Sequence, residues 1–111
     1  MKSSYPIAEA NLEETGFSYT MSLIQGKYKM SLLYCLSEFK VVRFNELKRY
    51  LSPISYKTLS AALKELEADD LVHREEYPQI PPKVEYSLTP RGRSLIPILD
   101  ALCDWGEAHR A

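Results

Sequence analysis

The stretch 52–70, SPISYKTLSAALKELEADD, constrains the fold more than any other part of the chain. Pro53 has a fixed φ and Ser55 can accept a hydrogen bond from a backbone N–H, so a helix is predicted to begin here after a turn. Apolar residues then recur at helical spacing and form one stripe: Leu59, Ala62, Leu63 and Leu66. The opposite face combines small residues with two long cations: Lys57, Ser60, Ala61 and Lys64. This face suits close approach to a phosphate backbone, and it equally fits the solvated side of an ordinary helix.

The sequence on either side of this helix predicts a helix-turn-helix followed by a hairpin. A short helix with a stripe of Phe44, Leu47, Tyr50 and Leu51 is expected to end before Pro53, because a residue that precedes proline disfavours helix. Two strands are expected at 71–77 and 83–88, separated by a loop that contains Pro78, Pro81 and Pro82. A helix-turn-helix directly followed by a hairpin has the order of the winged form of the motif.

Further helices are expected on both sides of this motif. Phe17, Met21 and Ile24 recur at helical spacing, Gly26 interrupts the pattern, and a second helix is expected at about 27–37. Thr89-Pro90 predicts the start of a final helix, with Thr89 as N-cap and a kink at Pro97. That helix has more apolar residues than a small core needs: Leu95, Ile98, Leu99, Leu102 and Trp105. The excess favours a second copy of the chain as partner over packing on the first two helices.

Composition limits the remaining function classes. A chain of 111 residues, 45% apolar and 26% charged, is typical of one globular domain. The net charge is −1, so any basic footprint for nucleic acid must be local. No apolar run approaches the ~18 residues of a membrane span, and the N-terminus lacks an apolar signal region. We therefore expect a cytoplasmic protein with no membrane partner.

No residues have the spacing of a catalytic or metal site. His73 and His109 lie far apart and have no cysteine or carboxylate at metal-ligand spacing. Cys35 and Cys103 fall on apolar helical stripes and are expected to remain reduced. The four glycines are dispersed, so no phosphate-cradling loop is present. The chain is expected to be no enzyme and to need no metal or cofactor.

Ordered blocks of the sequence resemble the HxlR-type winged helix-turn-helix transcriptional regulators. The blocks are IQGKYK at 24–29, RFNEL at 43–47, ISYKTL at 54–59, LKELE at 63–67, PPKVEYSLTP at 81–90 and LCDWG at 102–106. The resemblance covers about 15–106, which predicts a regulator domain at 15–111 behind an N-terminal arm at 1–14. It implies a mainly α fold with a small β-hairpin (α+β), in which N- and C-terminal helices flank the winged motif for dimerisation. It also implies a bacterial or archaeal regulator that binds operator DNA.

The resulting hypothesis is a homodimer on a pseudo-palindromic operator of double-stranded DNA. A recognition helix at about 55–68 would enter the major groove, and a wing at about 76–84 would reach an adjacent groove or the backbone. DNA contacts are expected at Arg43, Ser55, Tyr56, Lys57, Ser60, Lys64, Gln79 and Lys83. Dimer contacts are expected at Phe17, Met21, Leu95, Ile98, Leu99, Leu102 and Trp105. The alternative is a winged helix used only for protein contacts, whose recognition face should be apolar or acidic.

The chain departs from the family pattern at four positions. Gln25 replaces a glycine and Tyr28 replaces a tryptophan. Asp70 follows the recognition helix where the family usually has glycine, and Asp tolerates a left-handed helix end better than most residues. Thr15 occupies the position at which several members sense oxidants or electrophiles through a cysteine. Because threonine forms neither thiolate nor disulfide, that switch is not expected here.

Overall fold

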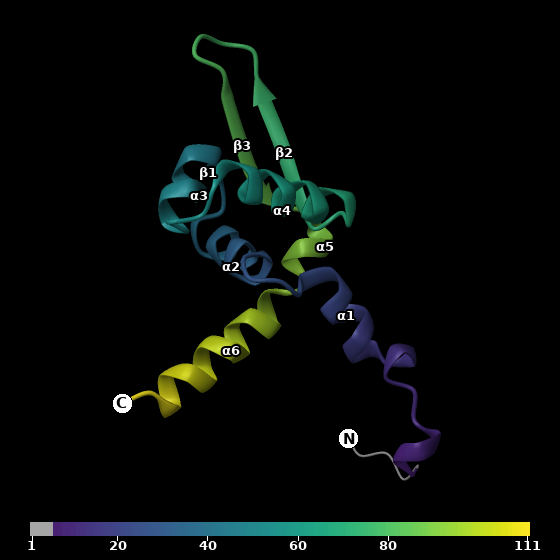
Figure 1. Ribbon diagram of the computed structural model, residues 1–111. Coiled ribbons are helices and arrows are strands. Elements are labelled where there is room, and N and C mark those ends of the chain that lie inside the picture. Colours follow the sequence, from purple (N-terminus) through teal and green to yellow (C-terminus); the bar gives the residue numbers. More distant parts are fainter. Residues whose placement is uncertain (1–5) are drawn as a thin grey trace.

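The computed structural model describes residues 6–111, so the first five residues of the arm expected at 1–14 lie outside the described part. The described chain is mostly helical with one small antiparallel sheet, which confirms the predicted fold class (Figure 1). In chain order the elements are two 3-10 turns, η1 (Ile7–Glu9) and η2 (Leu12–Glu14), then α1 (Gly16–Ile24), α2 (Lys29–Phe39), β1 (Val42–Arg43), α3 (Phe44–Tyr50), α4 (Tyr56–Ala68), β2 (Val72–Tyr77), β3 (Lys83–Leu88), α5 (Pro90–Arg93) and α6 (Ile96–His109).

Helices α3 and α4 form the predicted helix-turn-helix, and local signals fix where α4 begins and ends. The Ser55 hydroxyl accepts a hydrogen bond from the Thr58 backbone N–H at 3.1 Å, as expected of an N-cap. The α4 stripe of Leu59, Leu63 and Leu66 is buried against the body of the domain. Asp70 has φ 59°, which is the left-handed conformation expected directly after this helix.

The predicted hairpin is formed by β2 and β3 and belongs to a three-stranded sheet of order β1-β3-β2. The antiparallel register places Arg74 opposite Tyr86 and Glu76 opposite Val84, while β1 pairs Val42 with Tyr86 at the other edge of β3. In Figure 1 the far end of the hairpin projects well beyond the helices, on the side where α3 and α4 lie. The hairpin is therefore a wing beside α4.

The core lies where α2, α3, α4 and the base of the sheet meet. Its fully buried side chains are mainly leucines: Leu32, Leu33, Leu36, Leu47, Leu59, Leu63, Leu66 and Leu71. The short helix α5 is tied to this core by Thr89, whose hydroxyl accepts from the Gly92 N–H at 2.9 Å and donates to the Asp70 carbonyl at 2.6 Å. This capping, predicted for Thr89, fixes α5 against the turn that follows α4.

Gly92 allows α5 to approach the backbone of Leu71 closely. A Cβ at position 92 would lie 2.1 Å from the Leu71 carbonyl oxygen, which is backbone and has little freedom to move. Gly92→Ala is therefore expected to lower the free energy of unfolding by about 1–3 kcal/mol, seen as a drop of several degrees in Tm. Gly16→Ala is the matched control, because its Cβ would have no atom within 4 Å. Equal Tm values for the two variants would contradict this packing.

The C-terminal region differs from the prediction of one continuous helix kinked at Pro97. The chain instead turns at Ser94 and Leu95, so that α5 and α6 are separate helices and Pro97 lies in the first turn of α6. Proline is well tolerated there, because first-turn N–H groups have no partner within the helix. The break lets α6 leave the body in a direction of its own (Figure 1).

The helices at the two ends of the chain form diverging arms. In Figure 1, α1 and α6 extend away from the body and from each other. The radius of gyration is 16.7 Å, whereas a compact domain of this length has about 13 Å. The accessible surface is 8255 Å², against about 6,300 Å² for a compact monomer of the same mass. The arms thus expose surface that a compact monomer would bury.

Candidate nucleic-acid interface

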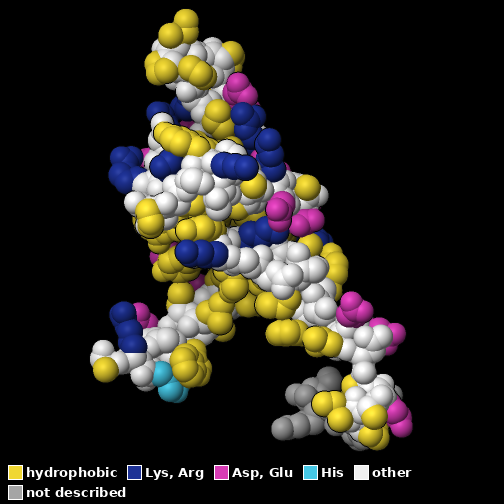
Figure 2. Space-filling view, in the orientation of Figure 1, with side chains coloured by type: hydrophobic (Ala, Val, Ile, Leu, Met, Phe, Trp, Pro, Cys, Tyr) yellow, Lys and Arg dark blue, Asp and Glu magenta, His cyan; other side chains and the backbone are white. Residues whose placement is uncertain are grey.

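Positive charge is concentrated in the segment that contains α3 and the first part of α4. The segment 43–64 carries five Lys or Arg residues and one acidic residue, although the whole chain has a net charge of −1. Figure 2 shows Lys and Arg side chains spread over this part of the molecule, with the apolar tip of the wing beyond them. The local basic footprint that DNA binding requires is therefore limited to α3 and the first part of α4.

The solvent face of α4 brings three of the expected DNA contacts into one row. Lys57, Ser60 and Lys64 follow one another at helical spacing, opposite the buried leucine stripe. Lys57 and Lys64 are exposed and Ser60 is part-buried. Ser55 has a different role, since its hydroxyl caps α4 and also contacts the Thr58 hydroxyl at 3.0 Å. Ser55 therefore acts mainly by fixing where α4 starts.

Tyr56 forms part of an aromatic and cationic cluster at the start of α4. Its ring stacks on Phe44 of α3, with centroids 5.8 Å apart and planes within 6° of parallel. The Lys48 ammonium lies 4.6 Å from the centroid of the Tyr56 ring. Arg43 is exposed at the end of β1, and its backbone N–H donates to Glu46 Oε1 at 2.8 Å. The first turns of α3 and α4 are thus held in a fixed relation to each other.

The wing places its two predicted contacts in different settings. Gln79 is exposed at the tip beside Ile80, whose side chain is 99% exposed. Lys83 lies on the shaft, with its ammonium 4.2 Å from the Tyr77 ring centroid and 3.8 Å from Glu85 Oε2. The charge of Lys83 is therefore shared with groups of its own hairpin, which makes it a weaker candidate for a phosphate than the α4 lysines.

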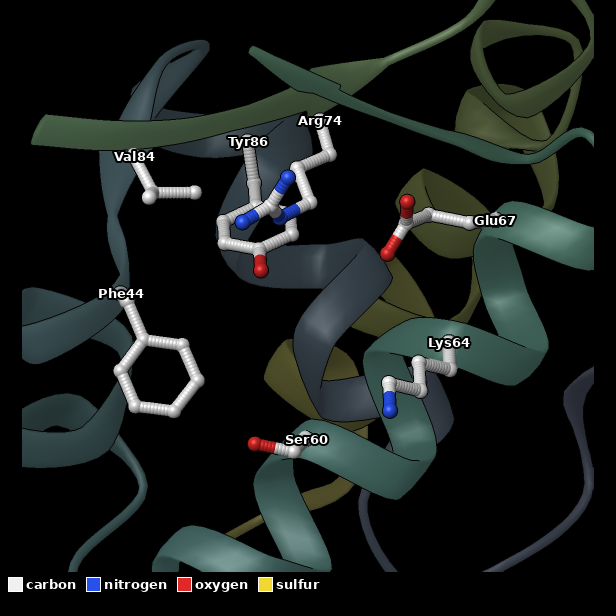
Figure 3. Close-up of a pocket in the computed structure, with 7 residues that line it drawn as sticks. All are labelled: Phe44, Ser60, Lys64, Glu67, Arg74, Val84 and Tyr86. Atoms are coloured by element: carbon white, nitrogen blue, oxygen red, sulfur yellow. The ribbon is translucent and has the colours of Figure 1, made fainter. Parts of the chain in front are cut away.

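Two hollows separate the helices from the wing and bring together residues that are distant in sequence. One lies between α4 and the hairpin, has a volume of about 420 Å³, and is lined by Phe44, Ser60, Lys64, Glu67, Arg74, Val84 and Tyr86 (Figure 3). The other lies between α3 and the wing loop, and includes Arg43, Arg49 and Lys83. The cations of the helices and those of the wing thus face the same spaces.

Sequence reasoning missed three cations on this face. Arg74 lines the hollow beside α4, Arg49 lines the hollow beside α3, and Lys48 covers Tyr56. The signal for Arg74 was its place in the alternating strand, two residues from Glu76, with which it shares a face. Only the sheet register shows that this face is the one turned toward α4.

The expected dimer residues divide into exposed and buried ones. Four of these large apolar side chains are unusually exposed: Phe17 (65%), Ile98 (47%), Leu102 (52%) and Trp105 (66%). Met21 and Leu95 are partly buried against the chain's own core, and Leu99, only 5% exposed, belongs to that core. The free apolar surface of α6 is therefore formed by the residues around Leu102 and Trp105.

Neither a metal-binding cluster nor a membrane-spanning helix is found among residues 6–111. No group of three His, Cys, Asp or Glu side chains there could hold a metal ion. Within the same residues, no helix is both long and apolar enough to span a membrane.

Comparisons with known proteins identify relatives over most of the chain. The family profile described as HxlR-like helix-turn-helix matches residues 23–111. An uncharacterised HTH-type transcriptional regulator of Halalkalibacterium halodurans is 60% identical over 96 residues, covering 86% of this chain and 85% of that protein. The uncharacterised regulator YdzF of Bacillus subtilis is 53% identical over 97 residues, covering 87% of this chain and 89% of its own.

Solved structures show the same fold. The redox regulator HypR in its oxidised form is 45% identical with a TM-score of 0.80, covering 87% of this chain and 99% of that one. A regulator of the MarR family from Porphyromonas gingivalis W83 is 33% identical with a TM-score of 0.83, covering 92% of this chain and 99% of its own. These relatives are described as transcriptional regulators or as a redox regulator, which is consistent with the expectation that this chain is no enzyme.

Proposed function

This chain belongs to the HxlR-like helix-turn-helix family of transcriptional regulators, and from that membership we propose that it binds a pseudo-palindromic operator as a homodimer. The observation that carries the proposal is the row of Lys57, Ser60 and Lys64 on the solvent face of α4, backed by a buried leucine stripe. An α-helix fits the major groove of B-DNA, and Lys and Ser side chains contact phosphates and base edges there. The regulator domain would comprise 15–111, behind the arm at 1–14.

The remaining contacts follow from how α4 would sit in the groove. Ser55 would hold the start of α4 close to the backbone, and Tyr56 would lie at the groove edge beside Lys48. Arg43 and the wing residues Gln79 and Lys83 would reach phosphates or an adjacent groove. Operator binding of this kind would take place in the cytoplasm, where a bacterial chromosome lies.

Dimerisation would cover the exposed arms. The accessible surface exceeds that of a compact monomer by about 2,000 Å², an area comparable to what each partner contributes to an obligate interface. Phe17 on α1 and Ile98, Leu102 and Trp105 on α6 supply the apolar part of this surface. A two-fold dimer would present two copies of α4 and so require two half-sites about one or two helical turns apart.

Fluorescence anisotropy with labelled duplex DNA tests this function. The chain is expected to bind random-sequence DNA at about 50 mM salt and to lose most of that affinity by about 200 mM, because lysine–phosphate contacts release counterions. Binding of duplexes selected by the chain itself should persist to higher salt. A winged helix used only for protein contacts would bind neither the random nor the selected duplex, at low or at high salt. That result would refute the proposal.

DNA binding is not expected to be switched by thiol chemistry. Thr15 caps α1, where its hydroxyl accepts from the Ser18 N–H at 3.0 Å. Burial raises the pKa of the Cys35 thiol, so little thiolate forms at neutral pH and oxidation is slow. Cys103, on α6, is part-buried. Treatment with diamide should leave the anisotropy curve unchanged, whereas a reversible loss of binding that disappears in Cys103→Ser would show the opposite.

A further inference from the structure

The hollow between α4 and the wing joins two expected DNA contacts, Ser60 and Lys64, to two charged residues that were not expected to contact DNA, Glu67 and Arg74. Ser60, Lys64 and Glu67 face it from one side of α4, at helical spacing, and Arg74 faces it from β2. Figure 3 shows these side chains pointing into a common space, with Tyr86 and Val84 of β3 behind them. The space is therefore bounded by the predicted recognition helix on one side and by the wing on the other.

Arg74 is held in position by its own sheet. Its cross-strand neighbour is Tyr86, whose side chain is 5% exposed and therefore fixed in the core. The neighbouring Tyr86 hydroxyl raises the pKa of Arg74 further above its usual value, and a guanidinium is charged at any physiological pH. Arg74 Nη2 also lies 3.0 Å from Glu76 Oε1. A guanidinium has five N–H donors, so these two contacts leave others free for a ligand.

The other groups in the hollow are suited to an anion. The Ser60 hydroxyl and the Lys64 ammonium are donors, and Lys64 is exposed. Within residues 6–111 no carboxylate lies within 4.0 Å of the Lys64 ammonium, so its charge is available. Glu67 is the one acidic residue among those that line the hollow. Three donors, two of them cationic, thus converge on a space of about 420 Å³.

We infer that this hollow seats a backbone phosphate of the operator, held by Lys64 from the helix side and by Arg74 from the wing side. The inference rests on the proposed function, because it concerns the same DNA complex. A helix in the major groove and a wing at the neighbouring groove must straddle the backbone strand that divides the two grooves. The hollow is the space between these two elements, so its donors meet that strand, and one such phosphate in each half-site fixes the register of the protein.

Glu67 opposes the phosphate that Lys64 and Arg74 hold. Its carboxylate lies on the same face of α4, one turn beyond Lys64, and points into the hollow in Figure 3. A negative charge at this place repels a phosphate, and the repulsion is stronger near a protein surface than in bulk water. Removing the charge of Glu67 should therefore strengthen DNA binding, which is the opposite of the effect of removing the charge of Arg74.

The first test compares salt dependence of binding to a duplex selected by the wild-type chain. Arg74→Gln should weaken binding and lower the slope of log K against log salt by about 0.9 per protomer, or about 1.8 per dimer. Glu67→Gln should tighten binding severalfold. Lys40→Gln and Glu38→Gln are the matched controls, because they remove the same charges from exposed side chains at the end of α2, outside α4, the wing and the two arms. Each control should bind like the wild type.

The second test identifies the phosphate itself. A neutral methylphosphonate is placed at single backbone positions of the selected duplex, and affinity is measured for the wild type and for Arg74→Gln. One position in each half-site should weaken wild-type binding and have much less effect on Arg74→Gln. Tyr86→Phe, which keeps the buried ring but removes the hydroxyl beside Arg74, should show an intermediate loss.

The outcomes separate this inference from the function on which it rests. If the wild-type chain binds no DNA, the proposed function fails. If the wild type binds with a steep salt dependence while Arg74→Gln keeps its full slope and every methylphosphonate effect, the phosphate seat is refuted and the function stands. If Arg74→Gln has lost its thermal transition, Glu67→Gln takes its place in the comparison, because that substitution removes a charge and no packing. Unchanged affinity of Glu67→Gln for DNA would also refute the inference.

Discussion

Replacing Leu102 with aspartate is expected to turn the dimer into monomers and to weaken operator binding by roughly 100-fold or more. Leu102 is 52% exposed on α6, beside Trp105, and the proposed dimer would bury it. Burying a carboxylate in an apolar interface without a partner is strongly unfavourable. A monomer then engages one half-site at a time and loses the gain from simultaneous binding at two.

Sedimentation velocity at micromolar concentration measures the first effect, and anisotropy with the selected duplex measures the second. Val41→Asp is the control, because Val41 is also exposed and apolar, at 55%, but lies on the body rather than on an arm. The control should remain a dimer with unchanged affinity. A Leu102→Asp protein that still sediments as a dimer would place the interface elsewhere.

Lys57→Ala combined with Lys64→Ala is expected to remove most of the electrostatic part of DNA binding. If each lysine neutralises one phosphate, the dimer loses four contacts, and the slope of log K against log salt falls by about 3.6. Both side chains are exposed on the face of α4 away from the core, so the fold and its Tm should be unaffected.

The control for this double variant is Lys27→Ala with Lys40→Ala, which removes two exposed cations that lie outside α3, α4, the wing and the two arms. It has the same net charge as the double lysine variant, so a difference between the two proteins reports location rather than total charge. Equal slopes for the two proteins would remove α4 from the DNA interface.

Net charge and local charge have separate consequences for such a regulator. The chain as a whole has a charge of −1, whereas the segment 43–64 carries five cations and one acidic residue. In the proposed complex, attraction to phosphates would be strongest in the orientation in which α4 faces the groove. The negative charge of Glu67, which lines the hollow beside α4, would weaken binding to DNA in general. Correct placement of the protein on its operator would then contribute more of the affinity.

The parts of the fold that follow from local signals were predictable from the sequence. The Ser55 cap, the left-handed Asp70 and the Thr89-Pro90 start all depend on residues within a few positions of one another. The two strands of the hairpin were likewise marked by alternation and by the prolines between them. These signals set the order of elements, and the order was enough to identify a winged helix-turn-helix.

Features that depend on tertiary packing were not predictable in the same way. Pro97 fits either the kink of a continuous helix or the first turn of a new one. The structure has the new helix, together with the close packing of Gly92 on Leu71. Leu99 and Leu102 share one apolar stripe in the sequence, but only Leu99 is covered by the core. Arg74 has the pattern of an ordinary strand surface until the register turns it toward α4.

Selection of bound duplexes from random DNA, followed by sequencing, tests the central claim most directly. The chain as a dimer with two copies of α4 is expected to enrich one two-fold symmetric sequence, with half-sites about one or two helical turns apart. The double lysine variant should enrich no sequence under the same salt conditions. Recovery of no DNA, or of a bound sequence that lacks two-fold symmetry, would contradict dimeric operator binding through α4.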